Sequence, residues 1–581
     1  MTPRAPNLNL LWSTLLIDEL VRNGISLFCI SPGSRSTPLT VAAARNANAR
    51  TRVFFDERSA AFFALGHARA TGTPAALICT SGTAVANYLP AVIESAQDFV
   101  PMILLTADRP PELRDTGANQ TIEQTGIFGA YLRWSVDMPC PDAAIPPAFV
   151  LTTVDQAVHR ALSQPPGPVQ INCMFREPLI PGPDEAPPGL PDSLQEWHSH
   201  RQPWTQYSIP ELTPAPAVIA RVGEKLAAAK KPLLVAGRLD TAEERQAVTR
   251  LAGHLNVPVF ADITSGLRSE TASFPLISHY NHMLNPAGAP PEFDCILHLG
   301  GRVVCKHLPL LPAKEKILVA PHPRRMDPAH NITLRVQAGI ASFCHALEHT
   351  IPAAGHSGAG TGLPACDAEL QRHFSAALDR GTLTEPAVAR CIARTILPGN
   401  GLYLGNSMPV RDFDMFVTAL PEGVQTTANR GASGIDGTLA SAAGFADGLA
   451  QPVTLVTGDL ALLHDLNSLS LLPGNPNPVI VVVINNHGGG IFSLLPVSQQ
   501  TDIFDEFFGT PHSFTFEHAA AQFGLGWQQP KGLDELQNMY AAALKQGRSL
   551  LIEISGDRQE NAALHRALER SARTIIEKTA W

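Results

Sequence analysis

Residues 478–496 read PVIVVVINNHGGGIFSLLP, and this stretch decides the fold class. Its first part, Pro478 to Ile484, is an unbroken apolar run with the length of a strand that is buried on both faces. Two amides, a histidine and three glycines follow at once, from Asn485 to Gly490. Because a plain turn needs one or two glycines, this composition predicts that the backbone comes close to something other than protein.

Short apolar runs alternate with helical stretches along the whole chain. Continuous apolar strands separated by helices predict parallel sheets that are covered on both faces. We therefore expect the α/β class, with three doubly wound parallel-sheet domains. The expected strands are 26–31, 52–55, 75–80, 102–107 and 168–173, then 232–237, 257–262, 295–300 and 316–320, and finally 401–406, 452–459, 478–485 and 549–554.

Two changes in composition divide the chain. Residues 181–216 are rich in proline and polar residues, which predicts an ordered or semi-rigid linker, and residues 351–365 form a Gly/Ala/Ser connector. The sequence therefore predicts domains at 1–185, 205–352 and 368–581, each of ordinary domain size.

The overall composition is that of a globular protein. The chain has 581 residues, of which 45% are hydrophobic and 16% are charged, and its net charge of -9 without a basic block argues against a nucleic-acid partner. Nine cysteines without a Cys-x-x-Cys pair predict reduced thiols. The first 24 residues read as an amphipathic helix, and no apolar run approaches the ~20 residues that span a bilayer. We expect a soluble, cytoplasmic protein with no membrane insertion.

Oxygen-bearing side chains follow two neighbouring strands of the third predicted domain. Asp459 ends one strand beside the start of a helix, and Asn486 ends the next strand 27 residues later. Ligands of parallel sheets bind beyond the carboxyl ends of the strands, so we expect these two side chains to meet. A carboxylate and an amide oxygen suit Mg²⁺, which also keeps substrate phosphates in its shell.

The pair Gly458-Asp459, followed at this interval by Asn486, resembles the diphosphate and Mg²⁺ motif of thiamine-diphosphate enzymes. Leu460 stands where that family commonly has glycine, but both metal-binding side chains are in place. The resemblance implies thiamine diphosphate as the cofactor. It also implies Mg²⁺, or Mn²⁺ in its place, coordinated by Asp459, Asn486 and the carbonyl of Gly488.

A second motif lies in the first predicted domain. Glu57 follows an apolar run and begins a helix, and residues 79–95 resemble the Thr-Ser-Gly cofactor loop of the same superfamily. The resemblance implies that Glu57 activates the cofactor through its aminopyrimidine ring, that Thr80 and Gly82 contact the cofactor, and that Ile435 holds it bent. In this superfamily the glutamate and the diphosphate site of one cofactor come from different subunits, which implies a homodimer or a dimer of dimers.

Arginines and polar side chains gather in the loops after the predicted strands, and arginine forks bind carboxylates. This set predicts a substrate with several negative charges. The members of this set are Ser34, Arg35, Arg109, Asn119, Gln120, Ser407, Arg411 and Arg430. The family resemblance implies that Lys306, Ile491, Phe492 and Leu495 also bind substrate and that Ile491 and Phe492 face the cofactor as well. It further implies that the residues acting in catalysis are Glu57, Ser34, Arg35, Gln120 and Ser407.

Four segments, with the stretch quoted at the outset, resemble one family over nearly the entire chain. They are SPGSRSTPL (31–39), FFDERSAAF (54–62), ANRGASGIDG (428–437) and GDLALLHDLN (458–467). The family is the menaquinone-pathway synthases that make 2-succinyl-5-enolpyruvyl-6-hydroxy-3-cyclohexene-1-carboxylate. The resemblance implies a transferase that decarboxylates 2-oxoglutarate and adds the succinyl unit to isochorismate (1,4-addition). Each substrate has two carboxylates, which accounts for the arginines. This chain has Lys306-His307 where some relatives have Lys-Arg.

Three alternatives are weighed against this interpretation. Another thiamine-diphosphate enzyme, such as an acetohydroxyacid synthase or an oxoacid decarboxylase, would share Glu57 and the metal motif but would not need the arginines. A dinucleotide-dependent dehydrogenase requires Gly-x-Gly-x-x-Gly after a strand, and residues 233–244 lack it. A ligand-sensing binding protein without catalysis would not need Glu57, Asp459 and Asn486 together.

Overall fold

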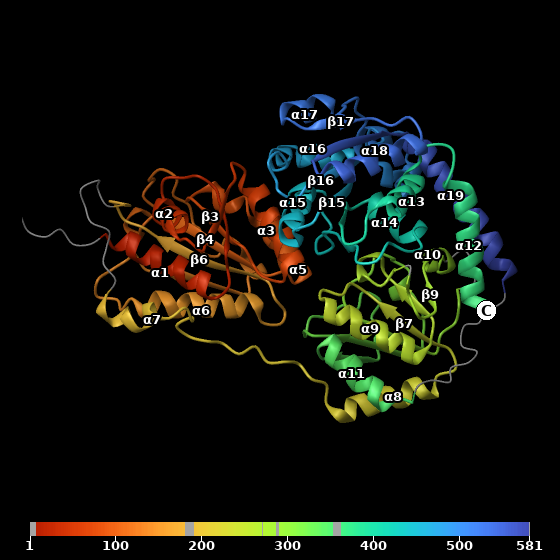
Figure 1. Ribbon diagram of the computed structural model, residues 1–581, viewed down its shortest axis with the longest axis horizontal. Helices are drawn as coiled ribbons and strands as arrows, with labels where there is room; N and C mark the ends of the chain where they lie inside the picture. Colours follow the sequence, from red (N-terminus) through yellow and green to blue (C-terminus); the bar gives the residue numbers. More distant parts are fainter. Residues whose placement is uncertain (1–6, 181–190, 270, 286–289, 353–361, 580–581) are drawn as a thin grey trace, which may run out of the picture. The chain divides into compact units, whose positions relative to one another are not determined.

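A computed structural model of the chain describes residues 7–180, 191–269, 271–285, 290–352 and 362–579 (Figure 1). Within these residues the strands form three sheets of six strands each, and every pairing between neighbouring strands is parallel. The predicted α/β class with three parallel-sheet domains is therefore confirmed. The chain divides into two compact units, the first made of residues 1–210 and 430–449 and the second of residues 211–429 and 450–581.

The first unit is built around one sheet with helices on both faces. Its strands, in spatial order, are β2 (Arg50–Val53), β1 (Leu27–Ile30), β3 (Ala76–Cys79), β4 (Met102–Asp108), β6 (Pro168–Met174) and β5 (Trp134–Met138). Helices α1 (Leu8–Arg22), α2 (Thr37–Arg45) and α6 (Ala148–Leu162) share an apolar core with one face of this sheet. Helices α3 (Glu57–Thr71) and α5 (Leu89–Asp98) pack against each other on the other face (Figure 1).

Helix α15 (Thr438–Leu449) packs against α3, although the sequence places it within the third predicted domain. The two helices cross with their backbones in contact, because a Cβ atom on Gly66 or on Gly444 would lie 1.9 Å from a carbonyl oxygen of the facing helix. At the far end of α15, the carboxylate of Asp447 lies 2.9 Å from the ring of His67 on α3. Small residues thus allow a close helix crossing, and a polar contact fixes its register.

The part of the predicted linker that follows residue 190 is held against α1 and α6. Glu19 of α1 is fully buried and accepts hydrogen bonds from the indole N–H of Trp197, at 2.7 Å, and from the main-chain N–H of Trp204. Asp155 of α6 accepts a hydrogen bond from the amide of Thr205 at 2.7 Å. This stretch is ordered, as the composition predicted.

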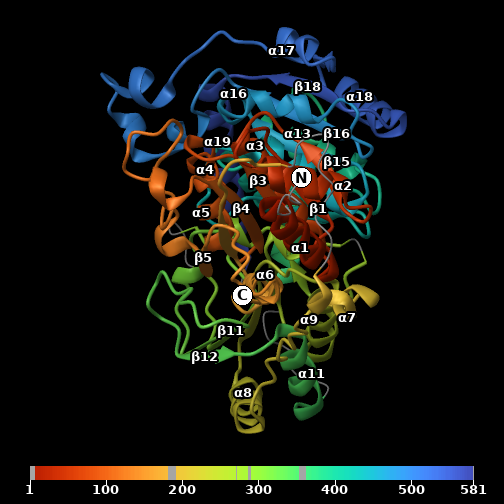
Figure 2. The ribbon, with the colours of Figure 1, turned by 90° about the vertical axis from the view of Figure 1, so that its left-hand side faces the viewer.

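The second unit begins with a sheet whose strand order is the 3-2-1-4-5-6 order of doubly wound nucleotide-binding folds. Its strands, in spatial order, are β12 (Leu334–Gln337), β11 (Glu315–Ala320), β10 (Cys295–Leu299), β7 (Pro232–Ala236), β8 (Val259–Ala261) and β9 (Leu276–Ile277). Helices α8 (Pro216–Ala228), α9 (Ala242–Leu255) and α11 (Ile340–Thr350) cover one face, and α8 and α11 lie side by side in both views (Figures 1 and 2).

The loops after β7 and β10, at the switch point of this sheet, pack against each other. The amide of Gly237 donates to the carbonyl of Leu299 at 2.9 Å, and a Cβ atom on Gly237 would lie 2.1 Å from the carbonyl oxygen of Gly301. These two loops are therefore held close together by their backbones at the switch point.

The third sheet repeats the strand order of the first. Its strands, in spatial order, are β14 (Gln425–Thr427), β13 (Gly401–Leu404), β15 (Val453–Gly458), β16 (Val479–Asn485), β18 (Leu550–Ser555) and β17 (Gly526–Gln528). Five helices contribute to the core on one of its faces, namely α12 (Gly362–Leu378), α13 (Glu385–Thr395), α14 (Met408–Phe416), α18 (Leu533–Gln546) and α19 (Arg558–Lys578).

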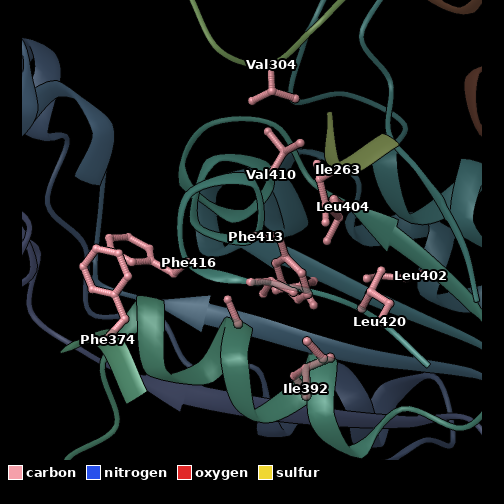
Figure 3. Close-up of a cluster of buried hydrophobic side chains, with 14 of the residues drawn as sticks. Ile263, Val304, Phe374, Ile392, Leu402, Leu404, Val410, Phe413, Phe416 and Leu420 are labelled. Atoms are coloured by element: carbon pink, nitrogen blue, oxygen red, sulfur yellow. The ribbon is translucent and has the colours of Figure 1, made fainter. Parts of the chain in front are cut away.

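One apolar core joins the second and third sheets, and α14 lies at its centre. Phe413 and Phe416 of α14 belong to this core, and Val410 of the same helix lies next to Val304 from the loop after β10 (Figure 3). Asp414 of the same helix is fully buried and accepts a hydrogen bond from Arg268 at 2.7 Å. The central sheet therefore fixes the position of α14, a helix on which a predicted substrate residue lies.

All the predicted strands are present among the described residues, although the one predicted at 52–55 occupies Arg50–Val53. Five further strands were not predicted, namely β5, β9, β12, β14 and β17. The predicted domain bounds stay a prediction, and parts of the predicted connectors, 181–190 and 353–361, lie outside the described residues. Among the described helices, none combines the length and the apolar character that crossing a bilayer requires.

Candidate functional site

Two loops of the second unit meet at the carboxyl ends of β15 and β16, which are paired strands. Asp459 follows β15 and begins the helix α16 (Asp459–His464), and its side chain is buried. Its Oδ2 accepts a hydrogen bond from the amide of Gly488 at 3.0 Å, and its Oδ1 accepts one from the amide of Leu460 at 2.6 Å. Burial raises the pKa of the Asp459 carboxyl, so a cation at this position would stabilise its charged form.

Asn486 stands at the end of β16 and has one free polar atom. Its side chain is 9% exposed, and its Nδ2 donates to Oε1 of Glu385 at 2.8 Å. Its Oδ1 is buried and has no hydrogen-bond partner among the described residues. A buried oxygen without a protein partner is uncommon, and such an oxygen can serve as a ligand to a cation. The donor set near it consists of a carboxylate, an amide oxygen and backbone carbonyls, which are the ligands that Mg²⁺ prefers.

The three glycines of this loop pack against the chain itself, and the predicted approach of their backbone to a non-protein group stays a prediction. A Cβ atom on Gly488 or Gly489 would lie 2.1 or 2.3 Å from carbonyl oxygens of residues 508–509. A Cβ atom on Gly490 would lie 2.5 Å from Nδ2 of Asn486. The glycines are needed because the loop packs against the chain's own atoms, whatever binds at its open side. Close approach to a non-protein group is not required to explain them.

An apolar turn follows the glycines. Residues Gly490–Leu494 form a 3₁₀ turn, on which Ile491 and Phe492 are half-buried, and Leu495 beyond it is 38% exposed. The ring of Phe492 lies 5.8 Å from that of Phe508, centre to centre, in an edge-on arrangement. The turn therefore presents partly exposed apolar surface next to the polar loop.

The loop after β13 holds Ser407 in a strained conformation. Ser407 has φ 69° and ψ -128°, which a side chain larger than hydrogen rarely adopts, and it precedes the first turn of α14. Arg411, one turn along α14, donates a hydrogen bond to its carbonyl oxygen. Three other predicted site loops contain non-glycine residues with positive φ, Gln120 at 52°, Ser433 at 61° and His487 at 60°. Backbone strain of this kind is concentrated at functional sites.

In the first unit, Glu57 begins α3 directly after β2. The carboxylate is half-buried, and the preceding residue, Asp56, caps the helix by accepting from the amide of Ser59 at 3.2 Å. Burial, and to a smaller degree the charge of Glu57, raises the pKa of the Cys79 thiol at the end of β3. Glu57 therefore lies beside the start of the loop that carries Thr80 and Gly82.

That loop is fixed by polar contacts. The hydroxyl of Thr80 accepts a hydrogen bond from the amide of Arg35 at 3.2 Å, and the amide of Gly82 donates to Oε1 of Gln124 at 2.9 Å. Gly82 has φ 90°, a conformation that favours glycine. The loops after β1, β3 and β4 are thereby joined at one edge of the sheet.

Two arginines of the first unit lie close together. Burial, and then the like charge of Arg109, lowers the pKa of the Arg35 guanidinium. Arg35 is buried and donates to the carbonyl of Phe175 at 2.8 Å and to Glu177 at 3.3 Å. The Nε atoms of Arg35 and Arg109 are both buried and lack a hydrogen-bond partner in the described part of the chain. Such a pair favours an anion between the two side chains.

The predicted site residues are thus distributed between the two units. The first unit holds Ser34, Arg35, Glu57, Thr80, Gly82, Arg109, Asn119 and Gln120 at the carboxyl edge of its sheet, and it also includes Arg430 and Ile435. The second holds Lys306, Ser407, Arg411, Asp459, Asn486, Gly488, Ile491, Phe492 and Leu495. Lys306 is exposed and lies two residues after Val304, which packs near Val410 of α14 (Figure 3).

Two residues near the Asp459 loop were not predicted from the sequence. They are Glu385, which contacts Asn486, and His512, whose Nε2 lies 3.2 Å from Oδ2 of Asp459. No spacing signal links either residue to the loop, because each is far from it in sequence. In the described part of the chain, no group of three or more His, Cys, Asp or Glu side chains is arranged to hold a metal ion. Metal binding at this loop would therefore need amide and backbone oxygens in addition to the carboxylate of Asp459.

Comparison with known proteins gives a consistent result. Three family models match the chain: the N-terminal binding domain of thiamine pyrophosphate enzymes at residues 12–127, the middle domain at 190–404 and the C-terminal binding domain at 413–554. A benzoylformate decarboxylase structure from Polynucleobacter necessarius superimposes with a TM-score of 0.70 at 17% identity and covers 94% of this chain and 98% of its own, which shows the fold.

Curated relatives are similar over nearly the full length. A 2-succinyl-5-enolpyruvyl-6-hydroxy-3-cyclohexene-1-carboxylate synthase of Rubrobacter xylanophilus is 50% identical over 98% of this chain and 99% of its own. Synthases of the same name from Prosthecochloris aestuarii and Chlorobaculum tepidum are each 45% identical, over 97% and 98% of both chains respectively. The chain therefore belongs to the thiamine pyrophosphate enzymes, in the family of 2-succinyl-5-enolpyruvyl-6-hydroxy-3-cyclohexene-1-carboxylate synthases.

Proposed function

We propose that this chain catalyses the reaction for which its relatives are named, a transfer that belongs to menaquinone biosynthesis. It would decarboxylate 2-oxoglutarate and add the remaining four-carbon succinyl unit to the ring alkene of isochorismate. The balance is one 2-oxoglutarate and one isochorismate consumed for one CO₂ and one product, with a new carbon–carbon bond replacing the bond to the lost carboxylate. Full-length identity to synthases of this name carries the proposal.

The cofactor is thiamine diphosphate, and Mg²⁺ or Mn²⁺ would bind its diphosphate to the second unit. Asp459, Asn486 and the carbonyl oxygen of Gly488 would coordinate the metal. The buried Oδ1 of Asn486, which has no hydrogen-bond partner in the described part of the chain, and the buried carboxylate of Asp459 support this assignment, because carboxylate and amide oxygens are ligands that Mg²⁺ prefers. When bound, thiamine diphosphate supplies the carbon that attacks the oxo acid and accepts the electron pair released with CO₂.

Glu57 would hydrogen-bond the aminopyrimidine ring and exchange a proton with it. Its half-buried position at the first turn of α3, at the carboxyl edge of the sheet that also carries the loop of Thr80 and Gly82, supports this role. Thr80 and Gly82 would contact the cofactor from the neighbouring loop, and Ile435 would hold it bent.

The arginines would orient the carboxylates that do not react. Decarboxylation is favoured where the leaving carboxylate is not clamped by a cation, so arginine is expected at the distal carboxylate of 2-oxoglutarate and at the two carboxylates of isochorismate. We assign Ser407, Arg411 and Arg430 to the succinyl end. We assign Ser34, Arg35, Arg109, Asn119, Gln120 and Lys306 to the isochorismate end. Ile491, Phe492 and Leu495 would form an apolar wall.

We further propose a homodimer or a dimer of dimers, in which two copies of the chain share each cofactor. Val53 and Phe55, which flank the strand end before Glu57, are 67% and 73% exposed. Two large apolar side chains exposed this far beside a catalytic glutamate favour burial by a second copy. All nine cysteines are free and buried, which supports a reducing, cytoplasmic location.

An assay with both oxo acids tests the proposal against the alternative of another thiamine-diphosphate enzyme. The protein should release CO₂ from 2-oxoglutarate. It should form the carboligation product only when isochorismate is present. Comparable turnover of pyruvate, with or without isochorismate, would instead support a decarboxylase or an acetohydroxyacid synthase.

A further inference from the structure

Glu385 contacts Asn486 from behind the proposed metal site. It is the first residue of α13, 101 residues before Asn486 in the chain, and its side chain is buried. Its Oε1 accepts the hydrogen bond from Nδ2 of Asn486 at 2.8 Å. Because a planar amide has its nitrogen and oxygen on opposite sides, a partner that holds the nitrogen also decides where the oxygen points. Here the oxygen that remains is the buried, unpartnered Oδ1.

Gly490 constrains the same amide nitrogen from a second side. A Cβ atom at Gly490 would lie 2.5 Å from Nδ2 of Asn486, closer than non-bonded atoms approach. The nitrogen therefore sits against the bare Cα of Gly490 while it donates to Glu385. Two independent contacts, one polar and one steric, hold the side chain of Asn486 in a single orientation.

Glu385 itself is placed by charged neighbours and by open space. Asp412 of α14 and His565 of α19, whose Oδ1 and Nε2 lie 3.1 Å apart, act on Glu385 through their charges. Glu385 also lines a cavity of about 610 Å³ together with Lys531 and Asn561. Because polar side chains line part of this roomy cavity, water can enter the space that a shorter side chain at position 385 would leave.

We propose that Glu385 is a positioning residue, which acts by fixing the amide of Asn486 so that Oδ1 faces the metal that binds the diphosphate. The proposal rests on the proposed metal site and deepens it. A partner that orients a metal ligand typically contributes about 10- to 100-fold to metal affinity. Glu385 would contribute to metal binding without touching metal, cofactor or substrate.

The test is Mn²⁺ affinity, measured by electron paramagnetic resonance on the full chain at saturating thiamine diphosphate. Glu385→Ala removes the acceptor for Nδ2 and should lower the affinity for Mn²⁺ at least tenfold. Glu385→Gln keeps an acceptor oxygen for Nδ2 and should bind Mn²⁺ within about threefold of the wild type. Glu560→Gln, which removes a carboxylate lining the same cavity but not in contact with Asn486, is the matched control and should bind like the wild type.

A second perturbation reaches the same amide from its other side. Gly490→Ala should weaken Mn²⁺ as well, because its new methyl group displaces Nδ2. The double variant of Gly490→Ala and Glu385→Ala should lose less Mn²⁺ affinity than the product of the two separate fold-changes. The reason is that both changes release the same side chain, that of Asn486. At saturating Mn²⁺ and cofactor, kcat of Glu385→Ala should return to within about threefold of the wild type, which a disrupted fold would not allow.

Asp459→Ala separates this inference from the metal site on which it rests. The positioning role is wrong and the metal site stands if Asp459→Ala abolishes Mn²⁺ binding while Glu385→Ala leaves it unchanged. The same conclusion follows if Glu385→Gln binds Mn²⁺ as weakly as Glu385→Ala does. If Asp459→Ala also binds Mn²⁺ normally, the metal lies elsewhere and both proposals are wrong.

Discussion

The amide of Gly488 donates a hydrogen bond to Oδ2 of Asp459 across 3.0 Å, although 29 residues separate them in the chain. The bond joins the loops that follow two paired strands, β15 and β16, in which Gly458 lies opposite Ile484. Both loops carry proposed metal ligands, so any change that removes one ligand also loosens the other loop.

Asp459→Ala should weaken Mg²⁺ and thiamine diphosphate together, because the metal joins the protein to the diphosphate. We expect each affinity to fall at least tenfold in calorimetric titrations in which the other component is saturating. Asp502→Ala, which removes an exposed carboxylate of the same unit, is the control. An unchanged affinity for the cofactor in Asp459→Ala would place the diphosphate site elsewhere.

Glu57→Gln should leave folding and much of the cofactor affinity intact. Turnover should fall by about two or more orders of magnitude, which is the usual contribution of an acid–base group. Single-turnover release of CO₂ from 2-oxoglutarate measures the step directly. The exposed Glu196→Gln in the same unit should be normal. Carboligation by Glu57→Gln at close to the wild-type rate would rule out the assigned role.

Arg411→Ala should mainly weaken the binding of 2-oxoglutarate, and Arg35→Ala should mainly weaken the binding of isochorismate. Each change should cost roughly 1.5–3 kcal/mol, the value of a lost hydrogen bond to a charged group. Because Arg35 also holds the carbonyl of Phe175, its variant needs a check of thermal stability. KM and kcat/KM for each substrate measure the division. An equal loss of kcat/KM for both substrates in both variants would mean that the two ends of the site are assigned wrongly.

Glu19 predicts a dependence of stability on pH. Burial first, and then a hydrogen bond with Asp155, raises the pKa of Glu19 from 4.5 to about 8. The folded protein therefore binds this proton more tightly than the unfolded chain, and its stability should fall as pH rises from about 4.5 to about 8. Tm measured between pH 5 and pH 9 gives this slope.

Glu19→Gln removes the titration at the cost of one acceptor for the indole N–H of Trp197. The variant should be less stable than the wild type at pH 5, and the difference in Tm should shrink toward pH 9. A difference that stays constant over this range would show that Glu19 does not titrate there.

The interior strands could be predicted from the sequence, and most edge strands could not. Each unpredicted strand lies at an edge of its sheet, as β5, β9, β12, β14 and β17 all do. An edge strand has one neighbour and is partly exposed, so its sequence lacks a continuous apolar run. The burial of Leu334–Gln337, for example, is only partial, whereas every residue of Val479–Asn485 is buried. Interior strands carry a signal because both of their faces must exclude water.

The site was predictable where its residues follow interior strands. Asp459 and Asn486 stand directly after β15 and β16, and local sequence places both. Glu385 begins a helix and reads as an ordinary first-turn acid, because nothing in its own segment refers to Asn486. The number of glycines indicated an unusual backbone, but the contact of Gly488 and Gly489 with residues 508–509 could not be predicted, because those residues lie beyond the motif.

The most direct test of the account is identification of the product. The wild-type protein is mixed with thiamine diphosphate, Mg²⁺, 2-oxoglutarate and isochorismate, and CO₂ and the organic product are measured by mass spectrometry. The account predicts one CO₂ for each 2-succinyl-5-enolpyruvyl-6-hydroxy-3-cyclohexene-1-carboxylate formed, and no such product when either substrate is omitted or Glu57 is changed to glutamine. Release of CO₂ with isochorismate left unconsumed would contradict it.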